Sequence, residues 1–249
     1  MKYNFGIYDL NDCSDLNYKE RILIYKNAGF KELALFLDDQ YMKTGENYTE
    51  IIDFARSQGL EVKQVHIDYK ISNMICDEQS NQYFEYIKQK ANECRLLSIP
   101  YMVLHASRND NPPFVSEKQL TKLRNVTRQF LDVNFCFENV RSNVNLEKIL
   151  NLNEPNIKMC YDLGHAHAFA NEFDLFEKFK NYIVCSHLHN NYGKDEHKPL
   201  CDGEINYLPI IKKLSEIKNS SNCIEAFPSR GKNLTKEEFE TFVKKCKNV

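Results

Sequence analysis

Residues 19–36 read KERILIYKNAGFKELALF and show one unit of the pattern that decides the fold. The apolar residues of Lys19–Ala28 recur at helical spacing, and Gly29 stands where such a helix should end. Glu32–Phe36 then forms a short, mostly apolar strand candidate. Residues 49–66 repeat the same order of helix, glycine and strand. The sequence therefore predicts helices that alternate with strands.

Working outward, this alternation continues to both ends of the chain. The strand candidates are Asn4–Tyr8, Glu32–Phe36, Glu61–His66, Tyr101–His105, Asn134–Glu138, Lys158–Tyr161, Ile183–Leu188 and Cys223–Ala226. The helical patterns are Lys19–Ala28, Thr49–Ser57, Gln79–Leu97, Glu117–Leu131, Leu146–Leu150, Leu175–Lys180, Leu208–Ile217 and Lys236–Lys245. Eight strand–helix units in about 250 residues predict an α/β fold, a (β/α)8 TIM barrel. An open doubly wound sheet is the alternative, but it usually has a Gly-rich first turn, and residues 8–12 read YDLND. No linker divides the chain, so we expect one domain over residues 1–249.

Composition excludes several classes of protein. The chain has 249 residues, 42% of them hydrophobic and 27% charged, which excludes a disordered chain, a coiled coil and a collagen-like fibre. The net charge of −2 and the absence of long like-charge blocks argue against a broad nucleic-acid surface. No apolar stretch is long enough for a membrane span or a signal peptide, so we expect a cytoplasmic protein without a membrane partner. The nine cysteines form no C-x-x-C pair, and several lie in apolar runs, which favours reduced, buried thiols.

Candidate chemistry gathers at the predicted strand ends. All seven histidines lie at strand ends or in the loops that follow them, and none falls in a predicted helix. Glu138, Asp162 and Glu225 each end an apolar strand. In a barrel these positions converge at the carboxyl-terminal mouth. Each histidine alone is more readily read as a hydrogen-bonded core or rim residue, but the joint pattern favours a site. Converging carboxylates need a positive charge among them, which a divalent metal such as Zn²⁺ or Mn²⁺ supplies.

The sequence resembles the xylose-isomerase-like TIM barrel superfamily, which includes sugar isomerases and epimerases, related dehydratases and endonuclease IV. The resemblance rests on SHLHNN at residues 186–191, GKDEH at 193–197 and GEINY at 203–207. These stretches are similar to the superfamily's H-x-H-D-N, D-x-H and G-x-G-x-I-D-W block. Asn190 replaces the usual aspartate of the first part, and residues 201–202 (Cys-Asp) replace the first glycine of the last.

The resemblance to the isomerases implies one divalent metal ion (Mn, Zn, Co or Mg) held by Glu138, Asp162, His189 and Glu225. It also implies catalysis by the two glutamates. One would remove a proton from the carbon beside a sugar carbonyl and the other would return it, through a metal-stabilised enediolate. His165 matches a histidine that reaches the substrate or a metal. We expect His187, two residues before His189, to point to the other side of its strand.

The resemblance to endonuclease IV implies a different activity, hydrolysis of abasic DNA by up to three zinc ions. All nine ligand types of that family are present, at His66, His105, Glu138, Asp162, His165, His189, Asp195, His197 and Glu225. However, NVRSN at residues 139–143 replaces the Gly-rich stretch of that family, and basic clusters that could grip DNA are not evident. A sugar- or metal-binding barrel without turnover is a third alternative, which the retained glutamate pair disfavours.

The sequence analysis therefore predicts an isomerase or epimerase of a small sugar or sugar phosphate, with nucleic acid as a partner only under the endonuclease alternative. Arg108 and Arg230 are candidates to clamp a substrate anion, although solvated loop arginines are the commoner case. The loops Asp38–Tyr48 and Asp68–Met74 could form a lid or merely a packed rim. A homo-oligomer is possible.

Overall fold

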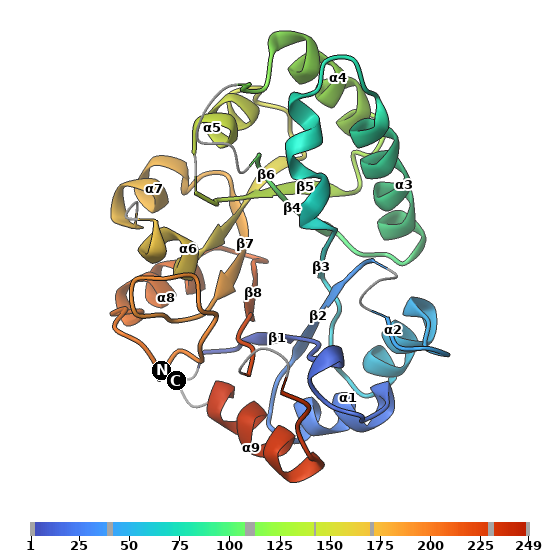
Figure 1. Cartoon of the computed structure of the whole chain (residues 1–249), viewed down its shortest axis with the longest axis vertical. Coiled ribbons are helices and arrows are strands. Elements are labelled where there is room, and N and C mark those ends of the chain that lie inside the picture. The colour runs from blue at the N-terminus through green and yellow to red at the C-terminus, as the bar shows by residue number, and fades with distance from the viewer. Residues whose placement is uncertain are drawn as a thin grey trace.

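In the computed structural model, eight parallel strands close into a barrel in sequence order, and helices surround the ring of strands (Figure 1). The structure describes residues 3–38, 42–107, 113–141, 143–169, 172–228 and 232–247. The barrel closes where β1 pairs with β8 through Gly6 opposite Cys223 and Ile7 opposite Ile224. The strands are β1 (Gly6–Tyr8), β2 (Glu32–Phe36), β3 (Gln64–His66), β4 (Tyr101–His105), β5 (Asn134–Glu138), β6 (Ile157–Asp162), β7 (Ile183–Leu188) and β8 (Ser221–Ile224). The predicted (β/α)8 barrel is confirmed.

The helices follow the strands closely and begin at recognisable caps. Asn17 illustrates this, because its side chain accepts from the backbone N–H of Lys19 and Glu20 while Glu20 reaches back to the Asn17 backbone. The α-helices are α1 (Tyr18–Asn27), α2 (Tyr48–Ser57), α3 (Gln82–Leu96), α4 (Glu117–Thr127), α5 (Val144–Leu150), α6 (Leu163–Ala168), α7 (Glu172–Phe179), α8 (Leu208–Ser215) and α9 (Lys236–Lys247). The described part of the chain also has two 3-10 helices, η1 (Asn11–Cys13) and η3 (Tyr69–Cys76). None of the described helices is both long and apolar enough to span a membrane.

Two local predictions were wrong. His165 and His167 lie in the short helix α6 rather than in a loop, because the Asp162 side chain accepts from the His165 N–H and starts a helix directly after β6. The predicted loop after β3 is mostly the 3-10 helix η3, which begins where Asp68 accepts from the N–H of Lys70. In the other lid candidate, residues 39–41 lie outside the described part of the chain.

Alternation along the strands divides the buried residues into two cores. Outward-facing residues pack under the helices in one large cluster, whereas inward-facing residues fill the barrel. Four consecutive strands each carry an inward cysteine two residues before a polar residue of the mouth: Cys136 and Glu138, Cys160 and Asp162, Cys185 and His187, Cys223 and Glu225. All four thiols are free and fully buried, so a layer of small apolar side chains supports the polar layer above it.

Candidate metal centre

Glu138, at the end of β5, lies at the middle of the carboxyl-terminal mouth with four imidazoles around its carboxylate. Its Oε2 lies 3.0 Å from His66 Nε2 and 3.2 Å from His105 Nε2. Its Oε1 lies 3.0 Å from His165 Nδ1 and 3.3 Å from His187 Nδ1. The glutamate is 1% exposed, so its charge is balanced by these rings rather than by water.

His187 lies inside this group, so the prediction that it points to the other side of β7 was wrong. Its Nδ1 is 3.0 Å from Glu225 Oε2, 3.3 Å from Glu138 Oε1 and 3.8 Å from Asp162 Oδ2. Residues two apart in a strand share a face, and His187 and His189 therefore both point into the barrel. Glu138, Asp162, His187 and Glu225 form one group close enough to hold a metal ion.

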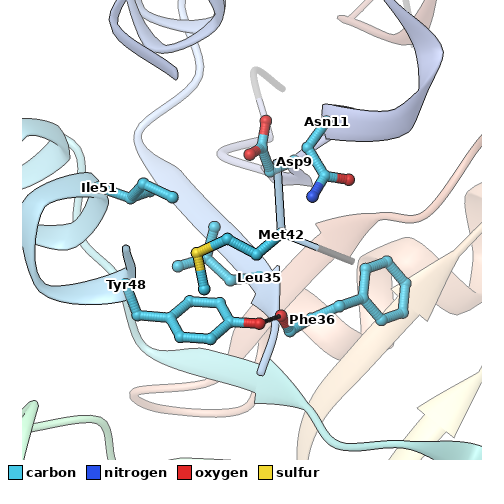
Figure 2. Close-up of a pocket in the computed structure, with 7 residues that line it drawn as sticks. All are labelled: Asp9, Asn11, Leu35, Phe36, Met42, Tyr48 and Ile51. Atoms are coloured by element: carbon cyan, nitrogen blue, oxygen red, sulfur yellow. Dashed lines mark hydrogen bonds between the residues drawn. The ribbon is translucent and has the colours of Figure 1, made fainter. Parts of the chain in front are cut away.

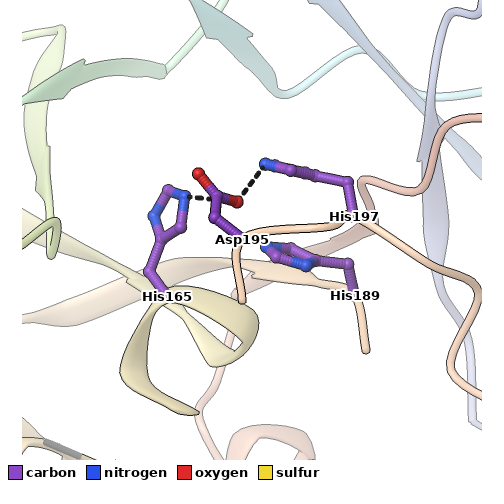
Figure 3. Close-up of side chains that lie close together, drawn as sticks. All are labelled: His165, His189, Asp195 and His197. Carbon is purple, nitrogen blue, oxygen red and sulfur yellow. Dashed lines mark ion pairs between the residues drawn. The ribbon is translucent and has the colours of Figure 1, made fainter. Parts of the chain in front are cut away.

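A second group lies beside the first and is built from His165, His189, Asp195 and His197 (Figure 3). The Asp195 carboxylate lies between two rings, 3.5 Å from His165 Nε2 and 3.0 Å from His197 Nε2. The ring of His189 stacks on that of His197 at 3.9 Å, and its Nε2 is 3.1 Å from Asp162 Oδ1. Asp162 thus borders both groups.

The backbone around the second group is built for close approach. His197 has a φ of 49°, a left-handed conformation that is strained for a side chain of this kind, and its Nδ1 bonds the Glu225 carbonyl oxygen at 3.0 Å. Gly164, in the first turn of α6, leaves room for the ring of His189, since a Cβ there would lie 1.9 Å from His189 Cε1. The backbone conformation at His197 and the lack of a side chain at Gly164 therefore let the imidazoles of this group pack closely together.

Burial and mutual charge oppose each other in the pKa values of these groups. Burial would raise the pKa of Glu138, but the imidazoles of His187 and His105 outweigh it and hold that pKa well below 4.5. Burial would lower the pKa of His187, but Tyr8, Glu225 and Glu138 raise it well above 6.5. His105 behaves differently, because burial dominates and lowers its pKa to about 4. Glu138 is thus kept ionised mainly by the neighbouring imidazole of His187, which in turn holds its own proton.

The donor set fits a divalent cation. Among the described residues, several buried polar atoms that face this centre lack a hydrogen bond of good geometry: Glu138 Oε1, Asp162 Oδ2, Glu225 Oε2, His187 Nδ1 and His189 Nε2. Unsatisfied buried atoms are costly, and converging ones fit a bound cation. Mixed carboxylate and imidazole ligands suit Zn²⁺ or Mn²⁺.

All nine predicted ligand positions lie together at the mouth of the barrel. Seven of them belong to the two groups above, and the other two, His66 and His105, contact Glu138. His187 joins them unpredicted, although strand alternation was the signal that could have found it. His167 lies apart, with Nδ1 2.7 Å from Asn191 Oδ1. The two anion-clamp candidates, Arg108 and Arg230, lie outside the described residues.

Asn190, which stands where the resemblance expects aspartate, ties the loop after β7 together. Its amide nitrogen donates to the Leu200 carbonyl at 2.7 Å, and its Oδ1 accepts from the N–H of Asn191 and of Ile205. A Cβ at Gly203 would lie 2.2 Å from Asn190 Oδ1, so glycine is needed there. The loop that carries Asp195 and His197 is therefore anchored by an uncharged amide.

Aromatic side chains surround the histidines. The distance between ring centroids is 5.6 Å for Phe36 and His66. It is 5.3 Å for Phe227 and His197, and 5.7 Å for Phe169 and His165. All three are half-buried, so they form an apolar wall beside the polar centre.

A small pocket of about 10 Å³ is lined by Asp9, Asn11, Leu35, Phe36, Met42, Tyr48 and Ile51 (Figure 2). Tyr48 Oη donates to the Phe36 carbonyl at 2.7 Å and closes one side. The space holds about one water molecule, so it is too small for a substrate.

The barrel and its carboxylate–imidazole mouth define a class of α/β-barrel protein with a candidate metal centre. The family model described as xylose isomerase-like TIM barrel matches residues 22–246. The chain therefore belongs to this family.

Solved structures of similar fold cover nearly the whole chain. The IOLI protein with a binding zinc atom has a TM-score of 0.77 at 17% identity, covering 98% of this chain and 96% of that one. The probable 3-DHS dehydratase AsbF of Bacillus anthracis has a TM-score of 0.75 at 16% identity, covering 97% and 98%. D-psicose 3-epimerase with D-tagatose, from Clostridium cellulolyticum H10, has a TM-score of 0.73 at 14% identity, covering 98% and 96%. At these identities the likeness shows the fold.

A curated relative matches over a shorter stretch. The uncharacterized protein MJ1311 of Methanocaldococcus jannaschii is 34% identical over 76 residues, which are 29% of this chain and 26% of that protein. The match thus spans about a quarter of the relative's length.

Proposed function

We propose that this protein is a metal-dependent isomerase or epimerase of a small sugar or sugar phosphate. The observation that carries the proposal is the placement of Glu138 and Glu225, two nearly fully buried carboxylates within 3.3 Å of the same nitrogen, His187 Nδ1. Two carboxylates that face one centre can remove a proton from one side of a substrate carbon and return a proton to it.

The residues that would hold the metal are Glu138, Asp162 and Glu225, with an imidazole from His187 or His189. When bound, a divalent ion would polarise the sugar carbonyl and so acidify the neighbouring C–H. The chain supplies the rest. His66 and His105 hold the Glu138 carboxylate in place, and its low pKa keeps it ionised, as a metal ligand and a proton acceptor both must be.

Two further observations support this reading. The aromatic wall offers apolar surface for the C–H face of a sugar and keeps water from part of the centre. Among the solved structures of the same fold, one holds D-tagatose in a 3-epimerase and another holds a zinc atom.

The test measures exchange of the substrate's C–H hydrogen with solvent deuterium, so the product need not be known in advance. Full-length protein is loaded with Mn²⁺, Co²⁺, Zn²⁺ or Mg²⁺ and incubated in D₂O with a set of ketoses, aldoses and their phosphates. We expect deuterium at the carbon beside the carbonyl of one substrate, detected by proton NMR, and loss of exchange on chelation. Glu225→Gln should remove exchange, whereas Glu204→Gln, at an exposed carboxylate 3.6 Å from His167, should retain it. Exchange by Glu225→Gln at the wild-type rate would exclude the proposed role of Glu225.

A second candidate function is hydrolysis of a phosphodiester in abasic DNA. The group of His165, His189, Asp195 and His197 favours it, because these side chains could hold a further ion beside the first. Elemental analysis of protein purified without chelator separates the two: about one metal ion per chain supports the isomerase, and two or three zinc ions support the hydrolase. Cleavage of an abasic oligonucleotide, with binding that weakens steeply in salt, would then establish the second function.

A further inference from the structure

A chain of hydrogen bonds crosses the interior of the barrel below the candidate metal centre. It begins at Glu32, in the first position of β2, and passes through Ser221 on β8 and Gln64 on β3. It continues to Tyr8 at the end of β1 and finishes at Nε2 of His187. Each of these five side chains is buried, and none of the first four belongs to the metal centre.

In the part of this hydrogen-bond chain that lies farther from the metal centre, donors and acceptors can be assigned. Ser221 Oγ donates to Glu32 Oε1, and Lys63 Nζ lies 3.8 Å from the other oxygen of that carboxyl. Gln64 Nε2 donates to Ser221 Oγ at 2.9 Å and lies 3.5 Å from the Ser221 carbonyl oxygen. A carbonyl only accepts, so the amide nitrogen of Gln64 must face Ser221 and its Oε1 must face Tyr8.

The assignment of Gln64 then determines the donors and acceptors between Tyr8 and His187. Gln64 Oε1 can only accept, so the Tyr8 hydroxyl donates toward it, at 3.5 Å. The lone pairs of that hydroxyl are then available to His187 Nε2, at 2.8 Å, which carries the proton in this arrangement. With its proton on Nε2, His187 presents Nδ1 to the carboxylates of Glu138 and Glu225.

We propose that Tyr8 is a positioning residue for the metal centre: through Gln64 and Ser221, it fixes His187 with the proton on Nε2 and with Nδ1 directed at the bound cation. This inference rests on the proposed function, since it assumes that a divalent ion is held among Glu138, Asp162 and Glu225. A histidine that ligates a metal is commonly held in this way by a partner on its other ring nitrogen. Here the partner is a phenol whose own direction is set from the opposite end of the barrel.

The first test compares two tyrosine-to-phenylalanine variants. Tyr8→Phe removes the hydroxyl but keeps the ring that packs edge-on to His187 at 5.0 Å. Tyr25→Phe is the matched control, because Tyr25 is equally buried and its hydroxyl donates to Asp9, away from the centre. Affinities for Zn²⁺ and Co²⁺ are measured by competition with a chromophoric chelator. We expect Tyr8→Phe to weaken binding by roughly 10- to 100-fold. Tyr25→Phe should leave binding within about 3-fold of wild type.

The second test determines which nitrogen of the His187 ring carries the proton. Long-range proton–nitrogen NMR on ¹⁵N-histidine protein, assigned with His187→Gln, should show His187 protonated on Nε2 in the zinc-loaded wild type and an altered pattern in Tyr8→Phe. If Tyr8→Phe does not fold, Gln64→Met interrupts the chain one step lower and should weaken binding in the same direction. Equal metal affinity in Tyr8→Phe and wild type, or a proton on Nδ1 of His187 in the zinc-loaded wild type, overturns the inference. Failure of the wild type to bind either metal would instead count against the proposed function, and a His187 Nε2 without a proton in the metal-free protein would still overturn the inference about Tyr8.

Discussion

Glu32 gives the sharpest test of the physical description, because it is a carboxyl buried at the end of the barrel opposite the candidate site. It is 7% exposed, and burial raises its pKa from 4.5 to about 7, although Lys63 lowers it in part. The substitution Glu32→Gln keeps the shape of the side chain and an acceptor for Ser221, and removes the charge. Its effect on stability should therefore depend on pH.

The magnitude follows from the two pKa values. A carboxyl with a raised pKa in the folded state binds its proton more tightly there than in the unfolded chain. Wild-type stability should therefore fall as pH rises from 4.5 to 7, by about 3 kcal/mol in total for a difference between 4.5 and about 7. Glu32→Gln lacks this loss. Relative to wild type, the free energy of unfolding of Glu32→Gln should rise by about 2 to 3 kcal/mol between pH 5 and pH 8.

Urea unfolding followed by far-ultraviolet circular dichroism, at pH 5, 6, 7 and 8, measures this difference. The control is Glu61→Gln, because Glu61 also pairs with Lys63 but is 65% exposed, so its substitution should show little pH dependence. A stability difference between Glu32→Gln and wild type that stays constant over this range would refute the reasoning. It would mean that Glu32 is solvated well enough to keep an ordinary pKa.

Three further predictions concern other parts of the molecule. Gly164→Ala should displace the His189 ring and weaken Zn²⁺ binding at least 10-fold, measured by chelator competition, and unchanged binding would contradict the close approach. Arg21→Ala should reduce the free energy of unfolding by about 3 to 5 kcal/mol in urea, because it leaves the Asp9 carboxylate buried without the Arg21 guanidinium. Metal affinity should rise between pH 6 and pH 8, since His187 has a raised pKa and must lose a proton to bind an ion; an affinity independent of pH would count against that imidazole as a ligand.

The barrel could be predicted because local signals agreed with one another along the whole chain. Glycines such as Gly29 and Gly59, both in left-handed conformations, end helices where the apolar pattern changes to that of a strand. Strand ends were less certain. In β8 the strand is Ser221–Ile224 rather than Cys223–Ala226, so Glu225 lies just past it, although its N–H still bonds the Leu188 carbonyl.

The candidate site was predicted in its members but not in all its geometry. The carboxylates could be found because Glu138 and Asp162 end apolar strands and Glu225 directly follows one, where an unpaired charge is costly. The helix that carries His165 was missed, although an aspartate at position 162 followed by LGH is a recognisable start for a helix. Which imidazole lies nearest each carboxylate depends on ring rotation and on loops such as residues 189–197. Sequence spacing alone does not determine these.

Carboxylates from three parts of the barrel meet at the candidate metal centre. The carboxylates of Glu138, Asp162 and Glu225 come from β5, β6 and the end of β8, and converge on the buried imidazole of His187. Such a concentration of buried negative charge is stable only with protons on the rings or with a cation among them. The second group, around Asp195, repeats this arrangement one step nearer the solvent. A count of the bound cations would therefore help to separate the two functions proposed above, since one ion would suit proton transfer and several would suit hydrolysis.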